Sequence, residues 1–140
     1  EIKMTDSEFS SRKLYEKEGQ NLDDTRQMAG QAPYVINAGL SYSNYEIGIN
    51  AGLFYNIKGP TLTIVGTGLY PDIYIKPFNS LEFTINKKLG KEKNAAVDLK
   101  ISNILNEKVQ QYYTAYQANN QSHREYRPGV SVSLGFSYKF

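Results

Sequence analysis

The last eleven residues, VSVSLGFSYKF, alternate without exception between apolar or aromatic side chains and small or polar ones. Successive side chains of an extended strand point to opposite faces of a sheet, so residues 130–140 are predicted to form an amphipathic strand. The same two-residue period predicts strands over residues 34–42, 47–56, 81–89 and 95–102. No helical period separates these stretches, which indicates an antiparallel sheet built from consecutive hairpins.

The connections between these strands alternate in length. The turns SNYE and GKEKN are short, whereas the stretches after Asn56 and after Gln117 are long. The first long stretch is rich in Gly and Pro and predicts an excursion with short extended pieces at residues 61–65 and 73–75. The second, ANNQSHREYRPG, is predicted to be a polar loop. Short turns at one end and long loops at the other are typical of an outer-membrane barrel.

The first 32 residues are polar and charged and show no sustained period. Residues 1–32 are predicted to be a polar loop, with a frayed strand near residues 9–15, leading into the barrel strands and loops of residues 33–140. A short helix within SSRKLYEKEG is the alternative, with Ser as its amino-terminal cap and Gly as its carboxyl-terminal cap.

Composition excludes several classes of partner. The net charge is +2, with 16 Lys and Arg against 14 Asp and Glu, which gives no electrostatic case for nucleic acid binding. The chain has no Cys, so disulfides and thiolate metal sites are excluded, and no cofactor is expected. No apolar run approaches the roughly 20 residues of a membrane helix, but a membrane strand needs only about 9–11 residues, half of them polar.

Alternation alone fits two interpretations, a soluble antiparallel sandwich and a membrane sheet. The polar face is rich in Gly, Ser and Asn, whereas a solvated sheet face favours Thr, Lys, Glu and Arg. The apolar face carries aromatic residues near the strand ends, namely Tyr34, Tyr42, Tyr55, Tyr138 and Phe140. Both features favour a membrane sheet with aromatic residues at its two interfaces. The soluble sandwich stays open as the alternative.

The polar residues do not form a catalytic constellation. His123 is the only His, and with Glu125 it makes too small a set for a metal site or a catalytic centre. It is predicted to be a solvated loop residue. Because no nucleophile, base and orienting group occur together, the chain is not expected to be an enzyme.

Two sets of polar residues have structural interpretations. Asn103 and Asn106, in SNILNEK, are predicted to form side-chain hydrogen bonds around a bulge or break in the strand. Glu82, Asp98 and Lys100 fall on the polar face, where cross-strand charge pairing in a wet barrel is expected.

Tyrosines are concentrated near the last long connection. Tyr112, Tyr113, Tyr116 and Tyr126 are candidates for stacking on a sugar or another ring-bearing ligand. Anchoring at the depth of the lipid headgroups explains the same residues equally well.

Several stretches occur in an order that resembles a known family. GQAPYVINAGLSY, LFYNIKG, SNILNEK and YRPGVSVSLGFSYKF follow one another as at the carboxyl end of TonB-dependent outer-membrane receptors, in the variant common in Bacteroidota. The resemblance covers residues 26–140. It implies the last strands of a large barrel in the bacterial outer membrane, closed by a separate plug and used for energised uptake of a siderophore, a glycan or a peptide.

The resemblance also implies partners. These are outer-membrane lipid, the remainder of the barrel and plug, the barrel assembly machinery, and an inner-membrane energy-coupling complex reached through an amino-terminal part. Phe140 would belong to the assembly signal that the machinery reads.

The expected fold is therefore all-β: an antiparallel up-and-down meander that forms part of a large transmembrane β-barrel. About five or six strands are too few to close a barrel, since the smallest barrels use about eight. No plug or energy-coupling segment is recognisable, so the chain is expected to be one piece of a longer polypeptide or to assemble with other chains. The alternative function is that of a soluble β-sandwich or small barrel that binds carbohydrate or protein.

Overall fold

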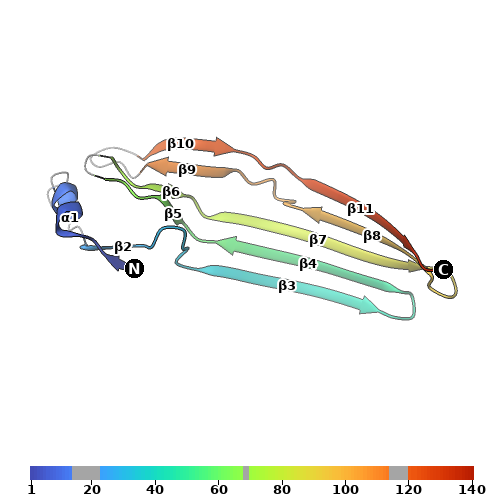
Figure 1. Ribbon diagram of the computed structural model, residues 1–140. Coiled ribbons are helices and arrows are strands. Elements are labelled where there is room, and N and C mark those ends of the chain that lie inside the picture. The colour runs from blue at the N-terminus through green and yellow to red at the C-terminus, as the bar shows by residue number, and fades with distance from the viewer. Residues whose placement is uncertain (14–22, 68–69, 114–119) are drawn as a thin grey trace. The chain divides into compact units, whose positions relative to one another are not determined.

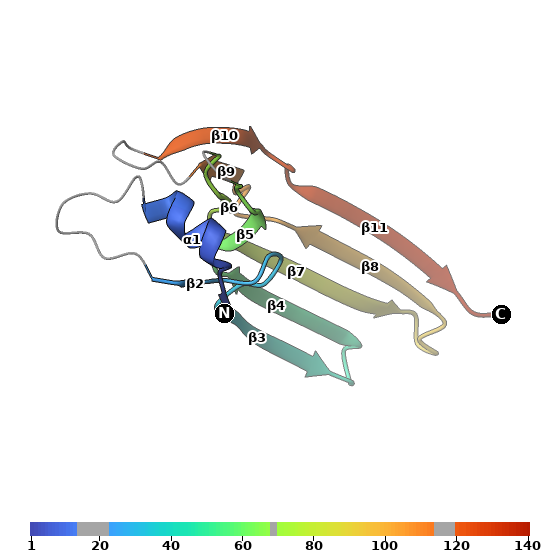
Figure 2. The same ribbon diagram turned by 60° about the vertical axis from the view of Figure 1, so that its left-hand side comes forward.

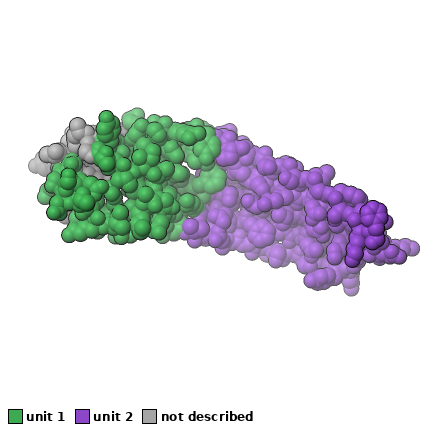
Figure 3. Space-filling view, viewed as in Figure 1, with its two compact units in different colours: residues 1–34, 58–78, 108–126 green, residues 35–57, 79–107, 127–140 purple. Residues whose placement is uncertain are grey.

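The computed structural model describes residues 1–13, 23–67, 70–113 and 120–140. Two compact units share these residues, each built from segments that are distant in sequence (Figure 3). Unit 1 comprises residues 1–34, 58–78 and 108–126, and unit 2 comprises residues 35–57, 79–107 and 127–140.

Unit 2 is a five-stranded antiparallel sheet with the strand order β11-β8-β7-β4-β3 (Figure 1). Its strands are β3 (Val35–Asn44), β4 (Ile49–Lys58), β7 (Phe78–Leu89), β8 (Ala95–Ser102) and β11 (Ser131–Tyr138), of which only the end residues Lys58 and Phe78 fall in unit 1. All five strands predicted from the alternation are confirmed. In chain order they run up and down across the sheet, so β3 and β11 are its two edges.

The register keeps the alternation in phase across the sheet. Leu134 of β11 lies opposite Leu99 of β8, and Leu99 lies opposite Ile85 of β7. The adjacent row pairs Ser133 with Lys100, and Lys100 with Thr84. Because a shift of one residue would reverse the two faces, this register separates the apolar side chains from the polar ones.

Unit 1 contains a second sheet, with the order β10-β9-β6-β5. Its strands are β5 (Thr61–Ile64), β6 (Ile73–Ile75), β9 (Val109–Tyr113) and β10 (Gln121–Tyr126). The short extended pieces predicted near β5 and β6 are confirmed. Leu62 and Ile73 are buried in this unit, and the buried Asp72 carboxylate accepts a hydrogen bond from the Gly66 N–H at 2.8 Å.

One predicted loop is a strand. The polar stretch ANNQSHREYRPG was expected to be irregular, but β10 pairs with β9 along its length. Its side chains are exposed throughout, so no apolar alternation marks it in the sequence. Backbone pairing with β9 holds the strand, and side-chain burial contributes little to it.

The amino-terminal segment also differs from the prediction. Residues 6–13 form the helix α1 (Asp6–Lys13), between β1 (Ile2–Lys3) and β2 (Thr25–Arg26) in the chain (Figure 2). The frayed strand expected from residue 9 is therefore wrong up to residue 13, and residues 14 and 15 lie outside the described part. A helix within SSRKLYEKEG was the alternative prediction. The observed helix begins before that stretch, because TDSE forms a capping box.

The capping box closes the first turn of α1 from both sides. The Glu8 carboxylate accepts hydrogen bonds from the Thr5 N–H at 3.0 Å and from the Thr5 hydroxyl at 2.8 Å, while the Glu8 N–H donates to Thr5 Oγ1. Arg26, whose side chain is nearly buried, also binds Glu8 at 2.9 Å. The bond from the Thr5 backbone N–H is the main reason why the pKa of Glu8 lies below its ordinary value; the Thr5 hydroxyl and Arg26 act in the same direction.

These contacts predict that the capping box stabilises α1 and that this stabilisation depends on pH. Thr5→Ala should destabilise α1 by about 0.5–2 kcal/mol, measured as the protection of the Phe9 amide, which donates to Thr5 O at 2.9 Å. Because the folded pKa of Glu8 is depressed, its contribution is complete above about pH 4.3 and is lost as the pH falls through the folded value. Glu8→Gln should remove this dependence. An unchanged acid dependence in Glu8→Gln would assign it to another group.

Candidate functional site

One face of the five-stranded sheet, which we call the outer face, is apolar and exposed. Leu134 is 77% exposed and Leu40 is 74% exposed, although both lie in the middle of strands. The residues predicted to share this face are Ile36, Leu40, Ile49, Leu53, Phe83, Val97, Val132, Leu134 and Phe136. A soluble sandwich would cover such a face with a second layer, and unit 2 has only one layer among its described residues. An apolar face of this size marks an interaction with lipid or protein.

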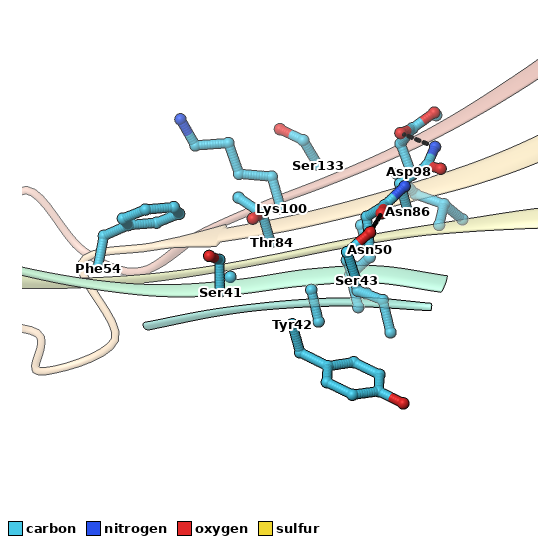
Figure 4. Close-up of a pocket in the computed structure, with 16 residues that line it drawn as sticks. Ser41, Tyr42, Ser43, Asn50, Phe54, Thr84, Asn86, Asp98, Lys100 and Ser133 are labelled. Carbon is cyan, nitrogen blue, oxygen red and sulfur yellow. Dashed lines mark hydrogen bonds between the residues drawn. The ribbon is translucent and has the colours of Figure 1, made fainter. Parts of the chain in front are cut away.

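The opposite face is polar and forms a groove of about 580 Å³ (Figure 4). Short cross-strand hydrogen bonds line it: Ser43 donates to Asn50 Oδ1 at 2.5 Å, and Asn86 donates to Asp98 Oδ1 at 2.6 Å. In Figure 4 the side chains of Ser41, Thr84 and Ser133 lie on this side of the sheet, whereas Tyr42 points away from it. The small side chains leave the face open to water.

The predicted charge pairing on this face is present. Lys100 Nζ lies 3.3 Å from the Glu82 carboxylate, across the β7–β8 pair. Both side chains are substantially exposed, so the ion pair contributes at most about 1 kcal/mol. Its position places a positive and a negative group together on the wet face of the sheet.

Phe54 is an aromatic exception on the polar face, and two glycines accommodate it. A Cβ at Gly52 would lie 2.7 Å from Phe54 Cε2, and a Cβ at Gly39 would lie 2.9 Å from Phe54 Cδ1. The ring therefore lies directly against the backbones of β3 and β4. The alternation placed Phe54 on this face, but its packing was missed. Glycines inside both strands, in the repeated sequence INAGL, were the available signal.

The break predicted at residues 103–106 is confirmed. Asn103 and Asn106 have φ values of 54° and 50°, in the left-handed region that Asn tolerates better than most residues. The Asn103 amide donates to Gly129 O at 2.8 Å, and the Asn106 N–H donates to Asn103 O at 2.8 Å. The first bond connects the end of β8 to the segment that leads into β11, and the second closes the turn after β8.

Glu107 extends the same network toward β4. Its carboxylate accepts hydrogen bonds from the backbone N–H and the side-chain amide of Asn79, and Asn79 Oδ1 accepts one from the Tyr55 hydroxyl at 3.2 Å. SNILNEK is therefore a structural junction that links β4, β7, β8 and β11.

The three candidate tyrosines that the structure describes have separate contacts. Tyr112 stacks on Tyr74, with ring centroids 6.1 Å apart, whereas Tyr113 meets the edge of His123 at 4.9 Å. Consecutive side chains of a strand point to opposite faces of the sheet, so the Tyr112 and Tyr113 rings lie on opposite faces of β9. Tyr126 lies under the Arg124 guanidinium at 5.3 Å. Tyr116 lies outside the described residues.

His123 is exposed as expected, but it belongs to a strand. The register of β10 shifts between Ser122 and Arg124, and His123 occupies that irregularity. Its Nδ1 lies 2.7 Å from the Tyr113 hydroxyl, which is a hydrogen-bonding distance. In the described ranges, no three His, Asp or Glu side chains gather in a way that could hold a metal ion.

Phe140 is fully exposed, and its ring contacts Tyr138 edge to face at 5.1 Å. Its role in assembly stays a prediction, as does the ligand or interface role of the tyrosines. No helix of the described residues is long and apolar enough to cross a bilayer.

An antiparallel sheet with unpaired edges, one exposed apolar face and one polar face has the features of a wall segment of a membrane β-barrel. The family model of the outer membrane protein beta-barrel family matches residues 6–138. The chain therefore belongs to this family and is located in the bacterial outer membrane. Comparison with curated proteins and with solved structures gives no match.

The left-handed backbone at Asn103 predicts an unequal pair of substitutions. Asn103→Ala loses the bond to Gly129 O and also places a Cβ-bearing residue that favours other conformations at φ 54°, so the free energy of unfolding should fall by about 2 kcal/mol. Asn103→Gly loses only the bond and should cost about 1 kcal/mol. Urea titration in detergent micelles measures both, and equal losses would contradict a conformational role for Asn103.

The register predicts opposite surroundings for neighbouring residues of β11. The chain has no Cys, so nitroxide labels at Leu134→Cys and Ser133→Cys report single positions. In bilayers, the label at position 134 should relax faster with oxygen, which partitions into lipid, and the label at 133 with a water-soluble nickel chelate. Equal accessibility to the two reagents would contradict the assignment of the faces.

Proposed function

We propose that this chain forms part of the wall of a TonB-dependent receptor that takes up a bulky nutrient, such as a siderophore, a glycan or a peptide. The proposal goes beyond the outer-membrane barrel family in naming energised transport. It rests chiefly on the polar face of the five-stranded sheet, where small polar side chains line an open groove. The ordered resemblance of residues 26–140 to the Bacteroidota variant of these receptors supports the same proposal.

The size of the lumen is the first step of the argument. Barrels of about eight strands fill their interior with their own side chains. Here Ser41, Gly52, Thr84 and Ser133 leave an open groove of about 580 Å³ on the polar face, instead of filling it with their own side chains. Such an interior suits a wide barrel whose lumen holds a plug and passes a solute.

The number of strands is the second step. In the described part of the chain, β3 and β11 each have a neighbour on one side only. Further strands are needed to complete the wall, from the same polypeptide or from other chains. The remaining strands of the wall are therefore proposed as partners. The resemblance to TonB-dependent receptors implies the other proposed partners: a plug, the barrel assembly machinery and an inner-membrane complex that supplies energy.

The inner face also has chemical character. The Lys100–Glu82 pair and the Asn86–Asp98 pair present charge and amide groups, and the exposed Phe54 ring offers an apolar contact at the end of the groove away from Asn86 and Asp98 (Figure 4). A solute or plug in contact with this face meets both hydrogen-bond donors and hydrogen-bond acceptors. No catalytic step is proposed for these residues.

This proposal predicts that bulk on the inner face blocks transport. Ser133→Trp adds a large ring to the groove, whereas Leu134→Trp adds the same ring to the lipid face one residue away. Uptake of a labelled siderophore, oligosaccharide or peptide by cells should fall several-fold for Ser133→Trp and stay close to the parent for Leu134→Trp. A protonophore should abolish the uptake by the parent protein.

The amount of folded protein in the outer membrane is the control for both variants. If all three classes of labelled solute enter at a rate that is insensitive to the protonophore, the proposal of energised uptake is wrong. Equal uptake by the two variants, at equal protein levels, would contradict the role given to the inner face.

A further inference from the structure

Lys87 interrupts the apolar outer face. It lies opposite Val97, which lies opposite Phe136, so its Cβ belongs to the row that faces lipid. Its Nζ donates to Ile47 O at 2.5 Å, in the turn that joins β3 to β4. A lysine near the end of a membrane segment extends its ammonium group toward the interface, because a charge in hydrocarbon is costly. The hydrocarbon region therefore ends close to this row.

One row further along, a cavity of about 360 Å³ opens on the same face. Leu89, Ala95 and Tyr138 lie opposite one another and form its apolar part. Residues of the β7–β8 turn form its polar part: Lys91, Glu92 and Asn94. We call this the turn-end cavity. Its mixed lining suits a molecule with an apolar part and a charged part.

Hydrogen bonds hold the turn-end cavity in place. The Lys139 N–H donates to Asn94 O at 2.8 Å, which fixes the end of β11 beside the turn. The Asn94 amide donates to Glu92 Oε2 at 3.1 Å, and Lys93 Nζ donates to Tyr45 O. Lys91 is exposed, and within the described ranges it has no carboxylate at ion-pair distance.

The charge at this end of the sheet is strongly positive. The residues at this end include five lysines and only two glutamates. The lysines are Lys87, Lys88, Lys91, Lys93 and Lys139, and the glutamates are Glu46 and Glu92. Exposed aromatic rings accompany them, with Tyr45 81% exposed and Tyr138 55% exposed. Aromatic residues and basic residues at one level are what a headgroup region with negative phosphates favours.

We propose that the turn-end cavity binds the phosphate headgroup of a membrane phospholipid. Lys91, which lines the cavity, binds the phosphate, while Leu89 and Tyr138 contact the glycerol and the first acyl carbons. The proposal goes beyond nutrient uptake and does not depend on it, because it requires only the outer-membrane location and the outward direction of the apolar face. Charge complementarity identifies the occupant as a phospholipid of the leaflet at the turn end.

The chain has no Trp, so one introduced Trp reports its own surroundings alone. Phe136→Trp places that reporter one row from the cavity on the lipid face. The protein is reconstituted in phosphatidylcholine bilayers that contain equal small fractions of brominated phosphatidylglycerol or brominated phosphatidylcholine. We expect phosphatidylglycerol to be preferred at this site by about fivefold, the factor that corresponds to about 1 kcal/mol per basic residue near an anionic lipid surface.

Two variants in this background test the residues. Lys91→Gln should bring the preference close to equality. Lys88→Gln is the matched control, because it removes the same charge from the neighbouring polar row, where Lys88 lies opposite Ala96. It should keep most of the preference. Circular dichroism checks that each variant keeps its sheet.

No preference in the Phe136→Trp protein, or an equal loss in Lys91→Gln and in Lys88→Gln, would overturn the proposal. Inorganic phosphate added at matched ionic strength should leave the preference unchanged. If phosphate removes it, the cavity is a free-anion site and the phospholipid assignment is wrong.

Discussion

The constraint on which this molecule depends is that backbone N–H and C=O groups cannot stay unpaired in hydrocarbon. Strands satisfy it only through their neighbours, so a membrane sheet has to continue until it closes. The five strands of unit 2 meet this requirement internally, with matched registers from β11 through β8 to β7. Their two edges do not meet it within the described residues, and this is why the sheet is part of a larger wall.

The same sheet also has to suit two solvents at once. Gly, Ser, Thr and Asn on the inner face keep it wet, while branched and aromatic side chains on the outer face contact lipid. Phe54 and Lys87 break this rule, and each has a local solution. Phe54 lies against the backbones of Gly39 and Gly52, and Lys87 carries its charge to the carbonyl of Ile47 at the strand end.

Sequence patterns could predict much of this fold because apolar and polar residues alternate along a strand whose two faces have different surroundings. That is why β3, β4, β7, β8 and β11 were all predicted, together with the break at Asn103. The strand β10 was missed because all the side chains of QSHREY are exposed, so no alternation of apolar and polar residues marks it in the sequence. The helix α1 was missed because its capping box, TDSE, starts before the stretch in which a helix was considered.

The candidate site was less predictable than the fold. The charge pair of Glu82 with Lys100 follows from strand pairing, which the alternation indicates. The tyrosines near β9 looked like one cluster because they are close in sequence, but a strand turns Tyr112 and Tyr113 to opposite faces. The packing of Phe54 depends on glycines of two strands, and only the register brings them together.

The central claim is that both edges of the five-stranded sheet are paired in the membrane. Solid-state NMR of the protein reconstituted in bilayers tests it most directly, through contacts between the α and amide protons of neighbouring strands. The account predicts that β3 and β11 each show antiparallel contacts to a second strand, in addition to those with β4 and β8. Contacts to β4 and β8 alone, in protein that is fully inserted, would contradict it.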